Sequence, residues 1–283
     1  MRKSVGFLVA MGVLHASPEV TEHAQALYQK TNYQASLRLL EQDPAPDAAT
    51  FELTGKNYFM LDNYEKAVQY FEKALALAPM DSDSHLWLGR AWGKRAEADG
   101  WFAAPSRASK ARQHFEMAIA LNPKNNEAMN DLFDFYLNAP GFVGGGVEKA
   151  EAIAGRIEHD RPAEYQHELA LLADHHKQHE EAILHLRKAM ELAPGEVGRV
   201  LDLAGYLGKI GRMEESEAMF AEAWKRWPGD RHIAFAHAKF YVDHHREPEV
   251  ARQYLELYLK AELTPDDPPR QAAEKLLRQV AHR

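Results

Sequence analysis

Histidine-rich turns are the part of this sequence whose residue types could bind a metal ion. The stretch DHHKQHEE contains His175, His176 and His179, and the first and last of these are four positions apart. Imidazoles at this spacing lie on one face of a helix and can ligate zinc, copper or nickel. The same stretch, and the similar DHHRE at 243–247, also fit exposed turns between helices, where polar residues are expected. Metal binding at these three histidines is therefore the less favoured hypothesis.

A glycine-rich stretch, NAPGFVGGGVEKAEAIAGRI at 138–157, could in principle cradle a phosphate. Gly144, Gly145 and Gly146 precede an expected helix and would offer backbone N–H groups to an anion. However, no lysine followed by serine or threonine closes the motif, and no strand precedes it. The glycines also lack the spacing of dinucleotide sites. We expect them to supply the positive φ angles of a tight turn into the next helix, and we predict no cofactor.

The composition excludes several classes of function. The 283 residues are 46% hydrophobic and 27% charged, as in soluble folded proteins, and the formal net charge of −8 argues against a nucleic-acid partner. The absence of cysteine rules out disulfides, thiolate catalysis and thiolate zinc sites. No nucleophile, base and orienting group can be assembled from the sequence. We therefore expect a protein that is not an enzyme.

The amino terminus has the order of a secretory signal. Arg2 and Lys3 precede the apolar run Val5–Leu14, and small residues follow at Ala16 and Ser17. The run is too short to cross a bilayer, and no later segment is apolar enough to do so. We predict that residues 1–16 are a signal peptide cleaved near Ala16, and that the protein is exported to the periplasm or envelope. The alternative is a cytoplasmic protein in which these residues form an ordinary first helix.

A repeated pair of helical patterns covers most of the chain. Within residues 47–79, Phe51 and Gly55 share one helical face, and after a turn Ala67 and Phe71 share another before a proline ends the pattern. Small residues stand where the two helices would approach closely, and large residues where they would fill the space between. The pattern resembles the tetratricopeptide repeat (TPR), a helix–turn–helix unit of ~34 residues.

The resemblance extends along nearly the whole sequence. It predicts an all-α fold, a TPR-type α–α superhelical solenoid of about seven helical hairpins. The expected units are 17–47, 48–81, 82–125, 126–162, 163–196, 197–230 and 231–264. The remaining segment, 265–283, has a suitable helix cap in Asp267 and one apolar stripe, so we expect a C-terminal helix that closes the open end of the stack.

Two units are longer than the repeat requires. Their extra residues fall between the two helices, around 96–105 and 138–146, and predict two long connectors. Trp101 and Phe102 would lie at the tip of the first connector and Phe142 at the tip of the second. These aromatics either pack on each other and on the solenoid or contact a partner. The pair of connectors, with AP…GG in the second, resembles a set of bacterial envelope TPR proteins.

The TPR resemblance implies an inner groove, lined by the first helix of each unit, that holds a peptide or another protein. The residues expected to line the groove are Lys56, Phe59, Arg90, Lys94, Asn130 and Asp134. They do not match the lysine, asparagine and arginine clamp of chaperone-binding TPR proteins, so that activity is not expected. The sequence thus predicts a non-catalytic scaffold or adaptor for an unidentified protein or peptide. Whether the chain forms homo-oligomers stays open.

Overall fold

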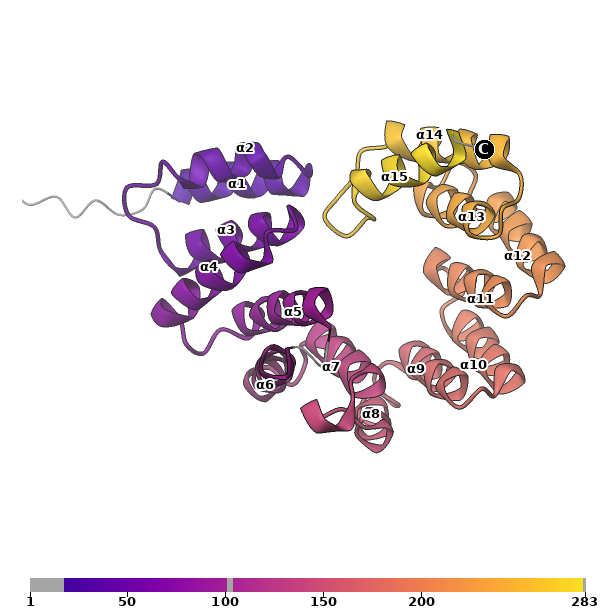
Figure 1. Cartoon of the computed structure of the whole chain (residues 1–283), viewed down its shortest axis with the longest axis horizontal. Coiled ribbons are helices and arrows are strands. Elements are labelled where there is room, and N and C mark those ends of the chain that lie inside the picture. Colours follow the sequence, from indigo (N-terminus) through magenta and orange to yellow (C-terminus); the bar gives the residue numbers. More distant parts are fainter. Residues whose placement is uncertain (1–17, 101–103, 282–283) are drawn as a thin grey trace, which may run out of the picture. The chain divides into compact units, whose positions relative to one another are not determined.

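The structure is a computed structural model, and it describes residues 18–100 and 104–281. All regular structure in these ranges is helical, with fifteen α-helices and one short 3₁₀ helix. The predicted all-α fold is therefore confirmed. The helices form two compact units, an N-terminal unit with α1–α4 and a C-terminal unit with α5–α15 (Figure 1). The predicted signal peptide, residues 1–16, lies outside the described residues.

The N-terminal unit is made of two helix pairs. Its helices are α1 (Pro18–Gln29), α2 (Tyr33–Leu40), α3 (Ala48–Met60) and α4 (Tyr64–Leu77). Helix α1 packs on α2 and α3 packs on α4, while α1 and α3 also touch each other. Ala24, Tyr28, Leu40 and Leu53 are buried together between the helices.

The C-terminal unit continues the same order of paired helices. Its elements are α5 (Ser82–Asp99), α6 (Pro105–Leu121), α7 (Asn126–Asn138), η1 (Gly141–Val143), α8 (Val147–Ala154), α9 (Pro162–His175), α10 (His179–Leu192), α11 (Val197–Lys209), α12 (Met213–Arg226), α13 (Arg231–Asp243), α14 (Pro248–Lys260) and α15 (Arg270–Ala281). We call the odd-numbered helices of the pairs, α1 to α13, first helices. In the C-terminal unit, α7, α9, α11 and α13 lie on the inner side of the arc and their second helices on the outer side (Figure 1).

Small residues set the distance between the helices of a pair. Ala67 on α4 is fully buried against α3. A Cβ atom on Gly55 would lie 2.7 Å from the ring of Phe71, and one on Gly89 would lie 2.7 Å from the ring of Phe115. The large ring therefore occupies the space that the glycine leaves, which is the pattern expected from the sequence.

Five of the helix pairs are joined by the same kind of turn. In each, one residue with positive φ follows the first helix, and the next backbone N–H donates to a carbonyl oxygen five residues earlier. These positive-φ residues are Thr31, Asp62, Lys177, Gly211 and His245. The bond pattern is the Schellman motif that ends many helices. Four of the five residues are not glycine, so these turns hold side chains in a backbone conformation that costs free energy.

Part of the long connector that we predicted in the unit 82–125 is helical. Residues 96–99 continue α5, with Ala96 fully buried, and Pro105 begins α6. The sequence Lys94–Asp99 is rich in good helix formers, so the helix extends until Gly100, whose positive φ ends it. The described residues of the insertion therefore lengthen α5 and begin α6, while residues 101–103 lie outside the described part of the chain.

The connector between α7 and α8 is a compact turn that needs its glycines. Gly144 and Gly146 have positive φ, and a Cβ on Gly145 would lie 1.8 Å from the carbonyl oxygen of Ala139. The backbone N–H of Gly146 returns to the carbonyl oxygen of Tyr136 on α7. These contacts confirm that the glycines serve backbone conformation, as the sequence indicated.

The last helix begins later than its sequence suggested. Asp267 does not cap α15, which starts at Arg270. Its buried carboxylate instead accepts hydrogen bonds from the backbone N–H of Thr264 and from Arg231 on α13. This arrangement fixes the loop before α15, and α15 then packs on α13 and α14.

Candidate functional site

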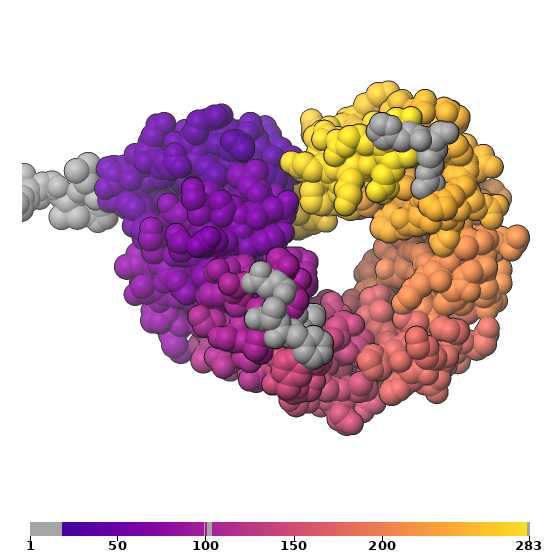
Figure 2. Space-filling view, in the orientation of Figure 1, coloured from indigo at the N-terminus to yellow at the C-terminus, as the bar shows by residue number. Residues whose placement is uncertain are grey.

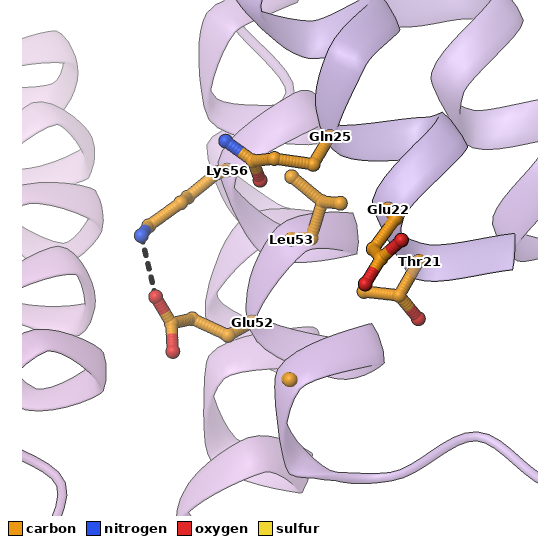
Figure 3. A pocket seen from close by; sticks show the side chains of 7 residues that line it. Thr21, Glu22, Gln25, Glu52, Leu53 and Lys56 are labelled. Carbon is orange, nitrogen blue, oxygen red and sulfur yellow. Dashed lines mark ion pairs between the residues drawn. The ribbon is translucent and has the colours of Figure 1, made fainter. Parts of the chain in front are cut away.

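The residues that we predicted to line a groove lie on the first helices α3, α5 and α7. In the N-terminal unit, α1 and α3 border a groove of about 370 Å³. Its lining residues are Thr21, Glu22, Gln25, Ala49, Glu52, Leu53 and Lys56, and all but Ala49 are labelled in Figure 3. Leu53 forms an apolar floor between polar residues of the two helices. The groove is thus suited to an extended polar segment with an occasional apolar side chain.

Lys56 and Phe59, two of the residues predicted from the sequence, differ in their surroundings. Lys56 lines this groove and forms an ion pair with Glu52, 2.5 Å from nitrogen to oxygen (Figure 3). Phe59 is half-buried and places its ring edge-on to that of Tyr64 on α4, with centroids 5.3 Å apart. Phe59 therefore contributes to the packing of the α3–α4 pair.

In the C-terminal unit, charged side chains bridge one first helix to the next. Arg90 on α5 donates from Nε to Asp131 on α7 at 2.5 Å and reaches Glu127 at 2.9 Å. Burial lowers the pKa of Arg90, but the charges and hydrogen bonds of Asp131 and Glu127 outweigh it and raise that pKa. The guanidinium also lies over the ring of Trp87. Arg90 is therefore already engaged within the protein.

A second bridge of the same kind joins α9 to α11. Arg199 donates to Glu164 and, more loosely at 3.4 Å, to Asp202. His167 stands near both acids, 3.8 Å from Glu164 and 3.7 Å from Asp202. Burial raises the pKa of Asp202, with His167 and Arg199 opposing it.

The contact between α7 and α9 differs from the two beside it. Asn130 accepts a hydrogen bond from Arg161 at 3.1 Å and approaches Glu164 at 3.4 Å. Deeper along the same contact are two carboxyl groups, Asp134 on α7 and Glu168 on α9. Glu168 is only 2% exposed, and neither of its carboxyl oxygens has a hydrogen-bond partner in the protein.

The pKa values of both acids at this contact are raised above their ordinary values. Burial raises the pKa of Glu168 to about 8, and the charges of Glu164 and Asp134 add to the effect while Arg161 opposes it. Burial also raises the pKa of Asp134 to about 6, with Asp131 and Glu164 adding and His167 opposing. The side chain of Asp134 is nevertheless exposed at the surface. At neutral pH Glu168 is therefore a neutral acid beneath an ionised one.

The polar contacts that link α5, α7, α9 and α11 form a row along the first helices. The remaining predicted residues take no part in it. Lys94 is exposed near the end of α5 and donates to Glu97 at 2.9 Å. Phe142 is 59% exposed, whereas its neighbour Val143 is buried where η1 packs on α6. Trp101 and Phe102 lie outside the described residues.

The three histidines of the predicted metal site are exposed at the turn between α9 and α10. His175 and His176 place their rings edge to face, while Nδ1 of His179 lies 3.0 Å from the hydroxyl of Tyr206 on α11. Asp174 accepts hydrogen bonds from Tyr206 and Lys209. Within residues 18–100 and 104–281, no three histidine or acidic side chains are grouped so that they could hold a metal ion.

Sequence comparison identifies two of the helix pairs. Residues 48–81 and 163–196 each match a family model described as tetratricopeptide repeat. These ranges coincide with α3–α4 and α9–α10. The chain contains tetratricopeptide repeats.

Solved structures of TPR proteins share the fold. A TPR protein from Parabacteroides merdae is 13% identical, with a TM-score of 0.60 over 93% of this chain and 98% of that one. A human IFIT1 dimer with PPP-AAAA is 18% identical, with a TM-score of 0.57 over 85% of this chain and 54% of that one. The APC/C hetero-tetramer Cut9–Hcn1 is 16% identical, with a TM-score of 0.51 over 92% of this chain and 48% of that one.

A comparison with curated proteins yields no match. Among the described helices of the TPR chain, none combines the length and the apolar character needed to span a bilayer.

The sequence did not point to the acids that face a neighbouring TPR. Asp131, Glu168 and Asp202 are the sixth residues of successive units and lie on the side of the first helix that meets the preceding first helix. Aligning the units on their small residues would have revealed an acid at this position three times in a row. Our groove prediction considered only the positions that face inward, and it therefore missed this pattern.

Proposed function

We propose that the chain is a non-catalytic interaction scaffold that holds an extended segment of another protein along its first helices. The observation that carries the proposal is the row of polar side chains that links the first helices α5, α7, α9 and α11 to one another, of which α7, α9 and α11 lie on the inner side of the C-terminal unit (Figure 1). Figure 2 shows the surface of this unit hollowed on the same side. Repeat solenoids use such extended concave surfaces to bind partners.

The comparisons support a protein partner better than a nucleic acid. Cut9–Hcn1, whose fold this chain shares, is an assembly of two kinds of protein. The IFIT1 structure contains PPP-AAAA. In this chain the first helices carry Asp131, Asp134, Glu164 and Asp202, and the formal net charge is −8, so the phosphates of a nucleic acid would meet repulsion.

A peptide library displayed on phage and selected on the immobilised full chain tests this proposal. Bound peptides would be synthesised, and their affinities measured by calorimetry against the wild-type chain and two variants. Asn130→Ala alters the row of polar contacts on the first helix α7, and Lys188→Ala removes an exposed lysine on the second helix α10. We expect the first variant to weaken binding by ~3-fold or more and the second to leave it unchanged. A library that yields no peptide, or equal effects of both variants, would refute the proposal.

We also propose that the protein is exported. The basic residues, the short apolar run and the small residues near Ala16 support this. Sequencing the amino terminus of the mature protein from its native cell decides the question. A chain that begins near Ser17 is expected, whereas one that begins at Met1 would mean a cytoplasmic protein.

A further inference from the structure

The acid that α9 presents to α7, Glu168, lacks the basic partner that the corresponding acids of α7 and α11 have. Between α5 and α7, Arg90 pairs with Asp131. At the α9–α11 contact, Asp202 pairs with Arg199 of its own helix, and His167 of α9 lies 3.7 Å from it. Glu168 occupies the same sixth position of its unit as these two acids. The residue of α7 that corresponds to Arg90 is Asp134, the ninth residue of its unit. Asp134 and Glu168, both acids, therefore stand at the positions that Arg90 and Asp131 take in the α5–α7 contact.

This contact differs from a group of surface acids because one of its acids, Glu168, is buried and has no hydrogen-bond partner. A buried carboxyl group without a hydrogen bond costs free energy, and native proteins rarely keep one without a reason. The charges of Asp134 on α7 and Glu164 on α9 both act on it, so its carboxyl group lies near the α7–α9 contact. Arg161, whose charge also acts on Glu168, donates instead to Asn130 and pairs with Glu164 at 3.6 Å. His167, on the same helix, faces Asp202 across the other contact.

We propose that an arginine side chain of the bound partner docks at this contact, with Asp134 as its direct ion-pair partner. Glu168, behind Asp134, supplies a second negative charge once the guanidinium is in place. The guanidinium would thus take the place that Arg90 has in the α5–α7 contact. Arginine is preferred over lysine because a planar guanidinium can bond an acid while lying between two packed helices. This inference rests on the proposed scaffold function, because it names one anchor of the partner.

Docking of a cation has a measurable consequence for protons. In the free protein Glu168 keeps its proton at neutral pH, and a guanidinium nearby favours its ionised form. Binding should therefore release a proton, and affinity should rise between about pH 6 and pH 8.5. Calorimetry in two buffers of different ionisation enthalpy measures this release directly. In Glu168→Gln, which is isosteric with the protonated acid, the release and the rise in affinity should both shrink markedly.

The peptides selected on the full chain provide the test. We expect them to share an arginine, and its replacement by glutamine should weaken binding by ~10-fold or more, as should Asp134→Asn. The two changes together should weaken binding no more than either alone. Asp134→Arg supplies the base from within the protein and should abolish the preference for arginine. Glu222→Gln, at an exposed acid of α12, is the control and should have no effect.

The outcomes separate this inference from the function on which it rests. Failure to select any peptide would refute the scaffold proposal itself. Peptides that bind the first helices without a shared arginine, or whose arginine is indifferent to Asp134→Asn, would refute only the arginine site. Because Asp134 is exposed, its variants are expected to fold, and circular dichroism checks this. Should Asp134→Asn nevertheless unfold, an unchanged proton release in Glu168→Gln would still overturn the inference.

Discussion

The hydroxyl of Ser216 on α12 donates a hydrogen bond to the carbonyl oxygen of Ala204 on α11, 2.7 Å away. Ser36 on α2 makes the same bond to Ala24 on α1 at 2.8 Å. In both pairs the second helix comes so near to the first that a side chain there can reach its backbone. Ala67 stands at the equivalent place in the α3–α4 pair, so a larger residue would not fit.

Ala67→Leu is expected to lower the free energy of unfolding by ~1–3 kcal/mol, because the added methylene groups overfill a closely packed crossing. Urea denaturation followed by circular dichroism measures the change. Gln69→Leu, an exposed position on the same helix, is the control and should change stability little. Equal stability of Ala67→Leu and the wild type would mean that the phase of the repeat is misassigned.

Lys177→Gly is expected to raise the free energy of unfolding by ~0.5–1 kcal/mol. Lys177 has a φ of 63° in the turn between α9 and α10, and glycine adopts this conformation without the contact between Cβ and the backbone. Gly211, with a φ of 84° in the corresponding turn after α11, provides the reverse experiment. Gly211→Ala should destabilise by a similar amount. Thermal denaturation measures both variants. The prediction fails if the melting temperatures of both lie above, or both below, that of the wild type.

Gly145→Ala is expected to destabilise the C-terminal unit by ~2 kcal/mol or more. Its Cβ would lie 1.8 Å from a backbone oxygen, so the turn before α8 must shift and its hydrogen bonds must weaken. Gly141→Ala is the matched control, since nothing lies within 4 Å of a Cβ placed there. Guanidinium denaturation compares the two variants. A tolerated alanine at 145 would show that the turn can readily adopt another conformation.

The stability of the protein is expected to fall as the pH rises from about 5 to about 8. In the folded state Glu168 holds its proton up to a pKa of about 8, whereas in the unfolded chain the group ionises near 4.5. Between these values the folded state binds more protons, so raising the pH favours unfolding. The contribution amounts to ~3–4 kcal/mol at most, at ~1.4 kcal/mol per unit of pKa.

Glu168→Gln isolates this contribution. The variant keeps the shape of the protonated acid and cannot ionise, so its stability should change less between pH 5 and pH 8 than that of the wild type. Urea midpoints at several pH values give the comparison. Parallel curves for the two proteins would mean that the carboxyl group is solvated in the folded state.

Much of the fold could be predicted because it depends on patterns that repeat in the sequence. Gly55 with Phe71 and Gly89 with Phe115 are complementary in size, and this complementarity is visible without a structure. The course of α5 was not predicted, because a longer unit does not tell whether its extra residues extend a helix or form a loop. Residues such as Ala96 and Glu97 favour a helix, and that local preference prevailed.

The candidate site was predicted only in part. Arg90 and Asn130 lie in the row of polar contacts within the protein, and Asp134 lies beside it; that these residues bind a partner stays a prediction. Their partners Asp131 and Arg161 were missed because a single unit does not show which side chains meet across two units. Glu168 was missed for the same reason, and its burial depends on the packing of α9 against its neighbours.

Closure of each hairpin by its own turn affects how quickly the chain folds. The described side-chain hydrogen bonds connect residues at most 43 positions apart, from Asn125 to Ser82. Contacts of such short sequence separation form early, so the protein should fold fast for its length. Each helix pair is stabilised mainly by contacts with the adjacent pairs. The pairs at the two ends can therefore unfold while the pairs in the middle stay folded. Hydrogen exchange should therefore be faster in the outermost helices α1 and α15 than in α9 and α10.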